Sequence, residues 1–189
     1  MDFLSLLQQT RSVRRFDHSQ KLSDEILSSI LESVRFVPSA RNAQTLKYKI
    51  VNRQEQCDDL FPLLAWAGYL NDWKGPKKEE QPVAYIIVCQ DNTLSPTSVV
   101  DEGIVLQTLQ LMAKSKGVSS CILGAFDRQK VKEMFLLDSS IEVRYILALG
   151  FGVETVVVED MIENQSIKYW RDEQEIHHVP KRKLKDLLL

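Results

Sequence analysis

The chain has 189 residues, enough for one domain of ordinary size, and its 44% of hydrophobic residues can fill a core. A formal net charge of -2 gives no overall electrostatic reason to bind nucleic acid or an anionic membrane. The N-terminus has no basic start followed by a long apolar stretch, and no apolar run approaches the roughly 20 residues that span a bilayer. We therefore expect a single cytoplasmic domain covering residues 1–189, with neither nucleic acid nor a membrane as partner.

The cysteines and histidines indicate no metal or redox site. The three cysteines are an odd number without metal-like or redox-like spacing, and Cys89 and Cys121 lie in apolar runs where a buried, inert thiol is expected. His177 and His178 are adjacent, so their side chains point in different directions and make a poor metal pair. We interpret both histidines as surface or hydrogen-bonding residues.

The first half of the chain mixes helical and strand-like patterns. Ser23 is a plausible N-cap, acidic residues follow it, and Pro38 ends the apolar repeat behind it. The polar run 74–81 is typical of a surface loop. The elements predicted here are a helix over 3–9, a helix from 24 that ends before 38, a strand over 47–51, an irregular helix over 60–73 and a buried strand over 83–89.

The longest predicted helix, 99–116, is apolar over most of its surface, which indicates a central position or a surface shared between subunits. A strand at 119–123, a helix at 129–136, a strand at 143–149 and a basic, helix-like tail at 181–189 follow it. Strands scattered among helices without a regular βαβ rhythm predict an α+β fold, with a mixed β-sheet flanked by helices. A doubly wound nucleotide fold would need a glycine-rich turn after its first strand, which this sequence does not have.

Two polar clusters in the first half could hold a flat, anionic ligand. Arg11, Ser12 and Arg14 could grip a phosphate, although a solvated basic corner at a helix end is the simpler interpretation. The loop 38–44 could present amides and carbonyls to a heterocycle, although a plain helix-to-strand turn would look the same. The candidate residues of this loop are Pro38, Ser39, Asn42 and Gln44.

Two further clusters lie in the second half. The strand that carries Ile122 and Leu123 ends at Gly124, where the missing side chain would let a flat ligand approach backbone N–H groups. The alternative for this cluster is a common strand-to-helix turn. Lys181 and Arg182 could complete a phosphate site or belong to a solvated tail.

In this order and at this spacing, the clusters resemble the nitroreductase family over nearly the whole chain. Several ordered matches with suitable loop lengths are far more specific than any single motif. The resemblance implies a homodimer with the long helix at its interface and two flavin mononucleotide (FMN) sites between the subunits. The similar stretches are Arg-Ser-x-Arg-x-Phe at 11–16, Pro-Ser-x-x-Asn-x-Gln at 38–44, DEGIVLQTLQLMAKSKGVSSCILGAFD at 101–127, ILALGFG at 146–152 and Val-Pro-Lys-Arg at 179–182.

The resemblance also implies roles for single residues. Arg11 and Ser12 would hold the FMN phosphate, helped by Lys181 or Arg182. Arg14 would lie by flavin N1 and the C2 carbonyl, where a cation raises the reduction potential. The other implied cofactor-binding positions are Pro38, Ser39 and Asn42 from the second subunit, Gln44 in the same loop, and Ile122, Leu123 and Gly124, of which the last two would face flavin N5 through their backbone.

The implied reaction is ping-pong and needs no side chain as a nucleophile. NADH or NADPH would reduce the flavin at N5, and a small acceptor such as a nitroaromatic, quinone or enone would then take the electrons. Alternatives are another flavin reaction (dehalogenation, dehydrogenation or flavin cleavage) and a non-catalytic flavin-binding protein. A nucleic-acid module using Arg11, Arg14, Arg15 and Arg41 is much less favoured, because of the net charge and because no known binding motif is recognisable.

The chain departs from the family pattern in three places. Thr10 stands where many relatives have a further basic residue, and Thr45 with Leu46 replaces the usual Pro-Trp. The region 56–81 is short, so we expect no large lid over the flavin. Trp66 and Tyr69 in this region could line an aromatic substrate pocket, but positions in the core are the better expectation.

Overall fold

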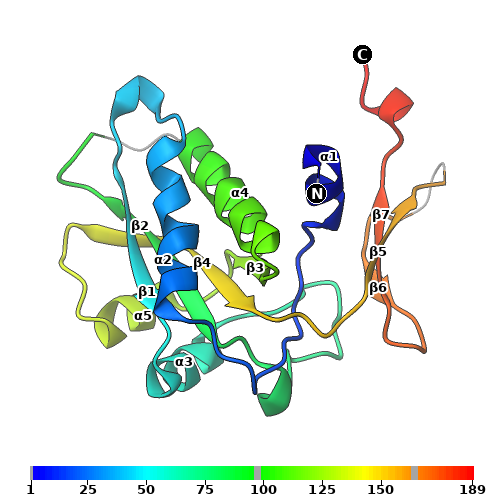
Figure 1. Cartoon of the computed structure of the whole chain (residues 1–189), viewed down its shortest axis with the longest axis horizontal. Coiled ribbons are helices and arrows are strands. Elements are labelled where there is room, and N and C mark those ends of the chain that lie inside the picture. The colour runs from blue at the N-terminus through cyan, green and yellow to red at the C-terminus, as the bar shows by residue number, and fades with distance from the viewer. Residues whose placement is uncertain (1, 96–98, 163–165) are drawn as a thin grey trace.

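The computed structural model describes residues 2–95, 99–162 and 166–189, and these form two β-sheets (Figure 1). The larger sheet has the strand order β1-β2-β4-β3, and every neighbouring pair in it is antiparallel. Because β2 and β4 are its central strands, their sequences are apolar over long runs. The strands are β1 (Leu46–Val51), β2 (Ala84–Asp91), β3 (Ser119–Leu123) and β4 (Ile141–Gly150).

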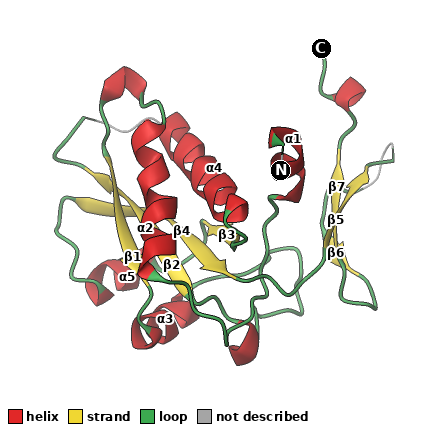
Figure 2. Cartoon of the chain, in the orientation of Figure 1, coloured by secondary structure: helices red, strands yellow, loops and turns green. Residues whose placement is uncertain are grey.

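Helices cover both faces of this sheet (Figure 2). On one face α2 and α4 pack side by side, with Leu27 and Leu109 fully buried against β2 and β4. On the other face α3 and α5 bury Leu60 and Val131. The α+β fold class is therefore confirmed. The helices are α1 (Phe3–Gln9), α2 (Asp24–Glu32), α3 (Gln54–Leu60), α4 (Val99–Ser115) and α5 (Arg128–Met134), and short 3-10 turns lie at Ser33–Phe36, Ala40–Asn42, Phe61–Leu63, Lys78–Glu80 and Leu184–Asp186.

The smaller sheet follows the core in the chain and consists of β5 (Val156–Asp160), β7 (His177–Lys181) and β6 (Trp170–Arg171), in that order across the sheet. Its β5-β7 pair is parallel and its β6-β7 pair is antiparallel. The sheet flanked by helices was expected to be mixed, but its described strand pairs are antiparallel, and mixed pairing occurs instead in this smaller sheet. In Figure 1 this sheet lies on the opposite side of α4 from α2, and α1 stands between α4 and β7.

An N-terminal arm of residues 11–17 lies between the two sheets and contacts both. Its Val13 N–H donates to the Ser120 carbonyl of β3 at 2.9 Å, and its Asp17 N–H donates to the Phe151 carbonyl at 2.7 Å. Phe16 is fully buried against Gly150, where an added Cβ would lie 2.9 Å from the Phe16 ring. The burial of Val13 and Phe16 therefore fixes the path of the arm past the end of β4, and the arginines between them remain half-buried.

Most of the predicted elements are present. The first helix has the predicted bounds, and the Ser23 hydroxyl caps α2 by accepting from the Ile26 N–H at 3.3 Å. β1 to β4, α4 and α5 lie within two residues of their predicted positions. The described part of the chain contains no helix with the length and apolar character needed to cross a bilayer.

Two predicted helices were wrong. The irregular helix over 60–73 is absent; the helix lies earlier, as α3, and a 3-10 turn containing Pro62 ends it, because proline has no N–H to continue the hydrogen bonding. The tail over 181–189 is not a continuous helix either. β7 includes Lys181, and the single turn at Leu184–Asp186 follows it.

Candidate functional site

The first candidate site is a cavity of about 320 Å³, here called the arginine cavity, between the N-terminal arm, α4 and the smaller sheet. Each of the three elements contributes polar side chains to it. Its lining consists of Thr10 at the end of α1, Arg11, Ser12 and Arg14 from the arm, Gln107 and Gln110 from α4, and Val156, Tyr169, His177, Val179 and Lys181 from the C-terminal part. The structure thus brings Arg11, Ser12, Arg14 and Lys181 together, although the sequence separates them by up to 170 residues (181 minus 11).

The arginines of this cavity have neutral partners. The Arg11 guanidinium donates to the Leu7 carbonyl at 3.0 Å and to the Thr10 carbonyl at 2.5 Å. The Arg14 guanidinium donates to the Ser12 carbonyl at 3.4 Å and lies 3.2 Å from His177 Nε2. Among the described residues, neither guanidinium forms an ion pair with a carboxylate. No directly paired carboxylate among the described residues therefore cancels their positive charges.

Arginines elsewhere in the same region are paired with carboxylates. Arg15 pairs with Glu80 at 2.6 Å and with Glu175 at 3.0 Å, and Arg171 pairs with Glu154 at 2.9 Å. The contrast with Arg11 and Arg14 is chemical as well as geometric, because an ion-paired guanidinium offers little net charge to a ligand. The unpaired cations give the arginine cavity the character of an anion-binding site.

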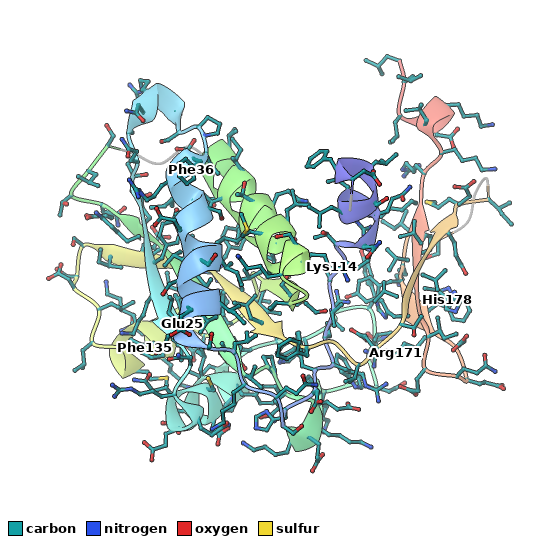
Figure 3. The ribbon with its side chains drawn as sticks, viewed as in Figure 1. Glu25, Phe36, Lys114, Phe135, Arg171 and His178 are labelled. Atoms are coloured by element: carbon teal, nitrogen blue, oxygen red, sulfur yellow. The ribbon has the colours of Figure 1, made fainter. Side chains whose placement is uncertain are left out.

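A buried ion pair holds the C-terminal segment against the arm. Glu154 has a fully buried side chain that accepts a hydrogen bond from the Arg14 backbone N–H and pairs with Arg171. The Arg171 guanidinium also lies 4.2 Å from the centroid of the Trp73 ring. In Figure 3, Arg171 lies at the lower edge of this segment and His178 lies higher on the smaller sheet. The wall of the arginine cavity is thus fixed to the core through Glu154.

The two adjacent histidines have opposite environments. His177 is 1% exposed, and burial together with the nearby cations lowers its pKa to about 4. His178 donates hydrogen bonds to the carboxylates of Asp172 and Glu159, which raise its pKa. Of the two alternatives, surface or hydrogen-bonding residue, His177 is therefore the second, because its ring is buried in the smaller sheet and lies 3.2 Å from the Arg14 guanidinium.

The second candidate site is a cavity of about 220 Å³, here called the loop cavity, beside the 38–44 loop. Asp101 of α4 is buried and holds this loop: it accepts from the Ser39 hydroxyl at 2.7 Å and from the Ala40 N–H at 3.0 Å. The Ser39 hydroxyl in turn accepts from the Gln44 N–H at 3.0 Å. The lining comprises Val34, Arg35, Val37, Pro38, Ser39, Asn42, Gln44, Thr45, Leu46, Tyr48, Asp101 and Val105.

The backbone of the 38–44 loop is strained. Arg41, Asn42 and Gln44 have φ values of 53°, 55° and 48°, in the left-handed region that favours glycine. Such conformations cost of order 1–3 kcal/mol each and persist only where the surroundings impose them. Asp101 supplies that constraint here. Strain of this kind is commonly found where a loop must present itself to a ligand.

The two cavities are separate within one chain but share α4. Asp101 and Val105 line the loop cavity, whereas Gln107 and Gln110 line the arginine cavity. At about 1.5 Å per residue, Asp101 and Gln110 are roughly 14 Å apart along the helix axis. Figure 3 shows Phe36, which precedes the 38–44 loop, far from Arg171 and His178. One chain therefore does not bring Pro38, Ser39, Asn42 and Gln44 together with Arg11 and Arg14.

The third predicted group lies on β3, the edge strand of the larger sheet. The Ser120 carbonyl faces the N-terminal arm, and strand alternation places the backbone groups of Ile122 on the same edge. Gly124 is exposed, and a Cβ added to it would make only an ordinary 3.5 Å contact with Tyr145. Packing within the chain therefore does not require glycine at this position, and the end of β3 remains accessible.

The remaining sequence candidates lie outside both cavities. Arg182 is exposed in the tail and does not line the arginine cavity. Trp66 is buried in the core, 5.8 Å from Phe61 between ring centroids, which agrees with the core alternative. Tyr69 is 46% exposed, and its ring lies 5.0 Å from that of Tyr169. Tyr69 therefore adjoins a residue of the cavity wall without lining the cavity itself.

The cysteines offer no reactive thiol and no disulfide. Cys57, Cys89 and Cys121 are all buried, as expected for the last two, and burial raises their pKa values to about 12, 11 and 11. The described residues also contain no group of three or more His, Cys, Asp or Glu side chains that could hold a metal ion.

Sequence reasoning missed Gln107, Gln110, Tyr169 and His177 as cavity residues. The two glutamines are polar positions in a helix that is otherwise mainly apolar, which is a signal that could have drawn attention to them. Tyr169 and His177 gave no such signal, because only the fold of the smaller sheet turns them toward the arm.

Comparison with known proteins finds relatives along most of the chain. The profile described as the Nitroreductase family matches residues 7–151. YdgI of Bacillus subtilis, which bears the provisional name NAD(P)H nitroreductase, is 22% identical over 207 aligned positions that cover 90% of this chain and 98% of YdgI. DrgA of Synechocystis is 27% identical over an alignment that covers 82% of this chain and 86% of DrgA. A solved structure from Exiguobacterium sibiricum, of a protein provisionally named a nitroreductase and bound to FMN, has a TM-score of 0.68 and 21% sequence identity. The match covers 82% of this chain and 90% of that protein's chain.

The role of Asp101 in holding the strained loop leads to a testable prediction. Asp101→Ala removes a buried acceptor of two hydrogen bonds, so the free energy of unfolding should fall by about 2–4 kcal/mol in urea denaturation. Trypsin should also cleave faster after Arg41 in the native variant. The matched control is Asp138→Ala, which removes an exposed carboxylate that likewise accepts from a backbone N–H and a hydroxyl, those of Ser140. If the two variants lose equal stability and Arg41 stays protected, Asp101 does not constrain the loop.

Proposed function

Because the chain belongs to the nitroreductase family, we propose that it is an FMN-dependent oxidoreductase that transfers electrons from NADH or NADPH to a small acceptor. The family match extends over residues 7–151, and the names of its relatives mention both the nicotinamide and FMN. The observation that carries the proposal is the arginine cavity, in which Arg11, Arg14 and Lys181 converge without a carboxylate partner among the described residues.

The donor set of the arginine cavity fits FMN. A phosphate dianion needs several cationic and hydroxyl donors, and the Arg11 guanidinium, the Ser12 hydroxyl and the Lys181 amine supply them from two sides of the cavity. His177 Nδ1 is a buried polar atom without a hydrogen-bond partner among the described residues, so the residues of the cavity wall include a polar atom that no described residue engages. The amides of Gln107 and Gln110 add donors and acceptors that suit the polar edge of a flavin.

Each group would have a separate task. Bound FMN supplies the hydride-accepting chemistry at N5, which no amino-acid side chain can replace. Arg11, Ser12 and Lys181 would bind and orient the phosphate end of FMN. Arg14 would provide a positive charge by the pyrimidine edge of the flavin, where negative charge develops on reduction. The open edge of β3, which carries the backbone groups of Ile122, would lie nearest the ring, and Gly124 would let the ring approach the end of the strand. No protein nucleophile is needed in this scheme.

We further propose that the site is completed by a second copy of the chain, whose 38–44 loop contributes Pro38, Ser39 and Asn42. Three observations support a homodimer. α1 has no buried residue in the single chain, although it is rich in leucine. Val99 and Val100 at the start of α4 are 71% and 65% exposed. Gly103 on the same helix has open space at its Cβ position, so a partner helix could approach closely there.

The decisive experiment is anaerobic reduction of the purified protein by each nicotinamide, followed by a panel of nitroaromatic, quinone and enone acceptors. The protein should purify yellow with about one FMN per chain, and NADH or NADPH should bleach it. An acceptor should then restore the colour. A colourless protein that takes up no added FMN would overturn the cofactor proposal. Bound FMN that neither nicotinamide reduces would instead indicate a flavin-binding protein or another flavin reaction.

The two arginines of the cavity should have separable effects. Arg11→Ala removes a charge-assisted phosphate contact worth roughly 1.5–3 kcal/mol, so FMN affinity should fall about tenfold to a hundredfold while the reduction potential barely moves. Arg14→Gln should leave FMN bound but lower the potential by roughly 20 mV for each 1 kcal/mol of lost differential stabilisation. Redox titration of saturated variants checks this. Arg15→Gln is the matched control, because Arg15 is already paired with Glu80 and Glu175. An unchanged potential in Arg14→Gln would remove Arg14 from the flavin ring.

The dimer proposal predicts a mass of twice the 21.7 kDa chain in light scattering at micromolar concentration. Interfaces of obligate type commonly bury upward of about 2,000 Å². Gly103→Arg should separate the subunits, since a long charged side chain would stand where the helices meet, and FMN should be lost with them. A monomeric wild type that keeps its flavin contradicts the shared site.

A further inference from the structure

His177 makes a contact that sets it apart from the other lining residues of the arginine cavity. Its Nε2 lies 3.2 Å from Nη1 of Arg14, and its ring is 1% exposed. Tyr169 packs against both partners: its ring centroid lies 5.1 Å from that of His177 and 4.9 Å from Cζ of Arg14. The guanidinium of Arg14 is therefore held between an imidazole and an aromatic ring, both from the C-terminal part of the chain.

The chemistry of this contact determines the state of the histidine. A guanidinium has only donors, so His177 Nε2 must accept with its lone pair. The ring proton must then be on Nδ1. That atom is buried and has no hydrogen-bond partner among the described residues. An unsatisfied buried donor is unfavourable, so the contact with Arg14 must offset its cost in stability or function must explain it.

His177 stays neutral at physiological pH. Burial is the main cause that lowers its pKa, to about 4, and the charges of Arg14, Arg171 and His178 act in the same direction. Glu154 lies nearby, but its carboxylate is engaged by Arg171 and by the Arg14 backbone N–H. The partner of the Arg14 side chain is therefore an uncharged acceptor.

A neutral acceptor differs from a carboxylate in its effect on charge. The carboxylates beside Arg15 and Arg171 fix those guanidinium groups and also cancel their charge. An imidazole lone pair fixes the direction of Arg14 equally well but leaves its full positive charge. Since the cavity holds Arg14, this charge is available to whatever binds there.

We propose that His177 is a positioning residue: its neutral Nε2 orients the Arg14 guanidinium toward the bound flavin and preserves the charge that raises the flavin's reduction potential. This rests on the proposed function. Two consequences follow that a purely structural role would not produce. The tautomer of His177 is fixed, and the charge of the group at position 177 controls the potential through Arg14.

The first test reads the tautomer directly and does not depend on flavin chemistry. Nitrogen-15 NMR of the purified, histidine-labelled protein at pH 7 should show a neutral ring protonated at Nδ1, assigned through loss of the signal in His177→Gln. In Arg14→Ala the ring should lose this preference and its pKa should move up toward the ordinary value. A ring protonated at Nε2, or one indifferent to Arg14→Ala, overturns the proposal even if the protein binds no FMN.

The second test varies the charge of the acceptor. His177→Gln places a neutral amide oxygen near the position of Nε2. This variant should keep its FMN affinity within about twofold of wild type, and likewise its ratio of affinities for reduced and oxidised FMN. His177→Glu supplies a carboxylate that pairs with Arg14, so the preference for reduced over oxidised FMN should fall about tenfold, which is about 30 mV for a two-electron couple. His178→Gln is the control, because its neighbours are Asp172 and Glu159 rather than Arg14.

A double-mutant comparison shows whether the effect acts through Arg14. In an Arg14→Gln background, His177→Glu should shift the potential no further. Equal reduction potentials in folded His177→Glu and His177→Gln would overturn the proposal. So would a shift caused by His177→Glu in the Arg14→Gln background that is as large as in the wild-type background. Near-ultraviolet circular dichroism establishes that each variant is folded. If His177→Glu does not fold, the tautomer measurement and the Arg14→Ala titration decide the question.

Discussion

The buried carboxylate of Glu154 is the interaction on which the arrangement of the candidate site depends. It accepts from the backbone of the N-terminal arm at Arg14 and pairs with Arg171 of β6, so one side chain joins two segments that the sequence places far apart. Charges this deeply buried are tolerated only when they are paired and hydrogen-bonded. Without Glu154, Arg171 would be a buried charge with no counter-ion, and the smaller sheet would lose its anchor on the arm. The arginine cavity exists because this anchor holds.

The distribution of partners among the arginines explains how a protein with a slightly negative net charge can offer an anion site. Carboxylates neutralise Arg15, Arg144 and Arg171, whereas carbonyl groups and an imidazole hold Arg11 and Arg14. Attraction for an anion is thus concentrated at one place, where the low polarity of the buried surroundings strengthens it. The net charge of the chain carried no information about this local field.

The sequence predicted those features that depend on short-range patterns. The apolar surface of α4, the run of β3 and the Ser23 cap of α2 follow from residues close in the chain, and the order of the motifs pointed to the arginine and loop clusters. The smaller sheet could not be predicted, because β6 has two residues and β7 contains Pro180. A proline is allowed there since β6 pairs only with His177 and His178, which leaves that edge of β7 unpaired at Pro180. Nor did Arg41, Asn42 and Gln44 reveal their backbone strain, since none of them is the glycine that normally marks it.

The wall of the arginine cavity that β5, β7 and Tyr169 contribute has little packed apolar surface. Of the described residues after 151, His177 and the side chains of the Glu154–Arg171 ion pair are buried, so substitutions at most other positions there remove little packed apolar surface. Selection can therefore alter the polarity of this wall with small effects on folding, whereas the arm on the opposite wall is tied to core packing through Val13 and Phe16. A duplicated copy of this chain would have a route to accept different molecules in this cavity through the exposed positions of the wall, while the packed arm keeps its place.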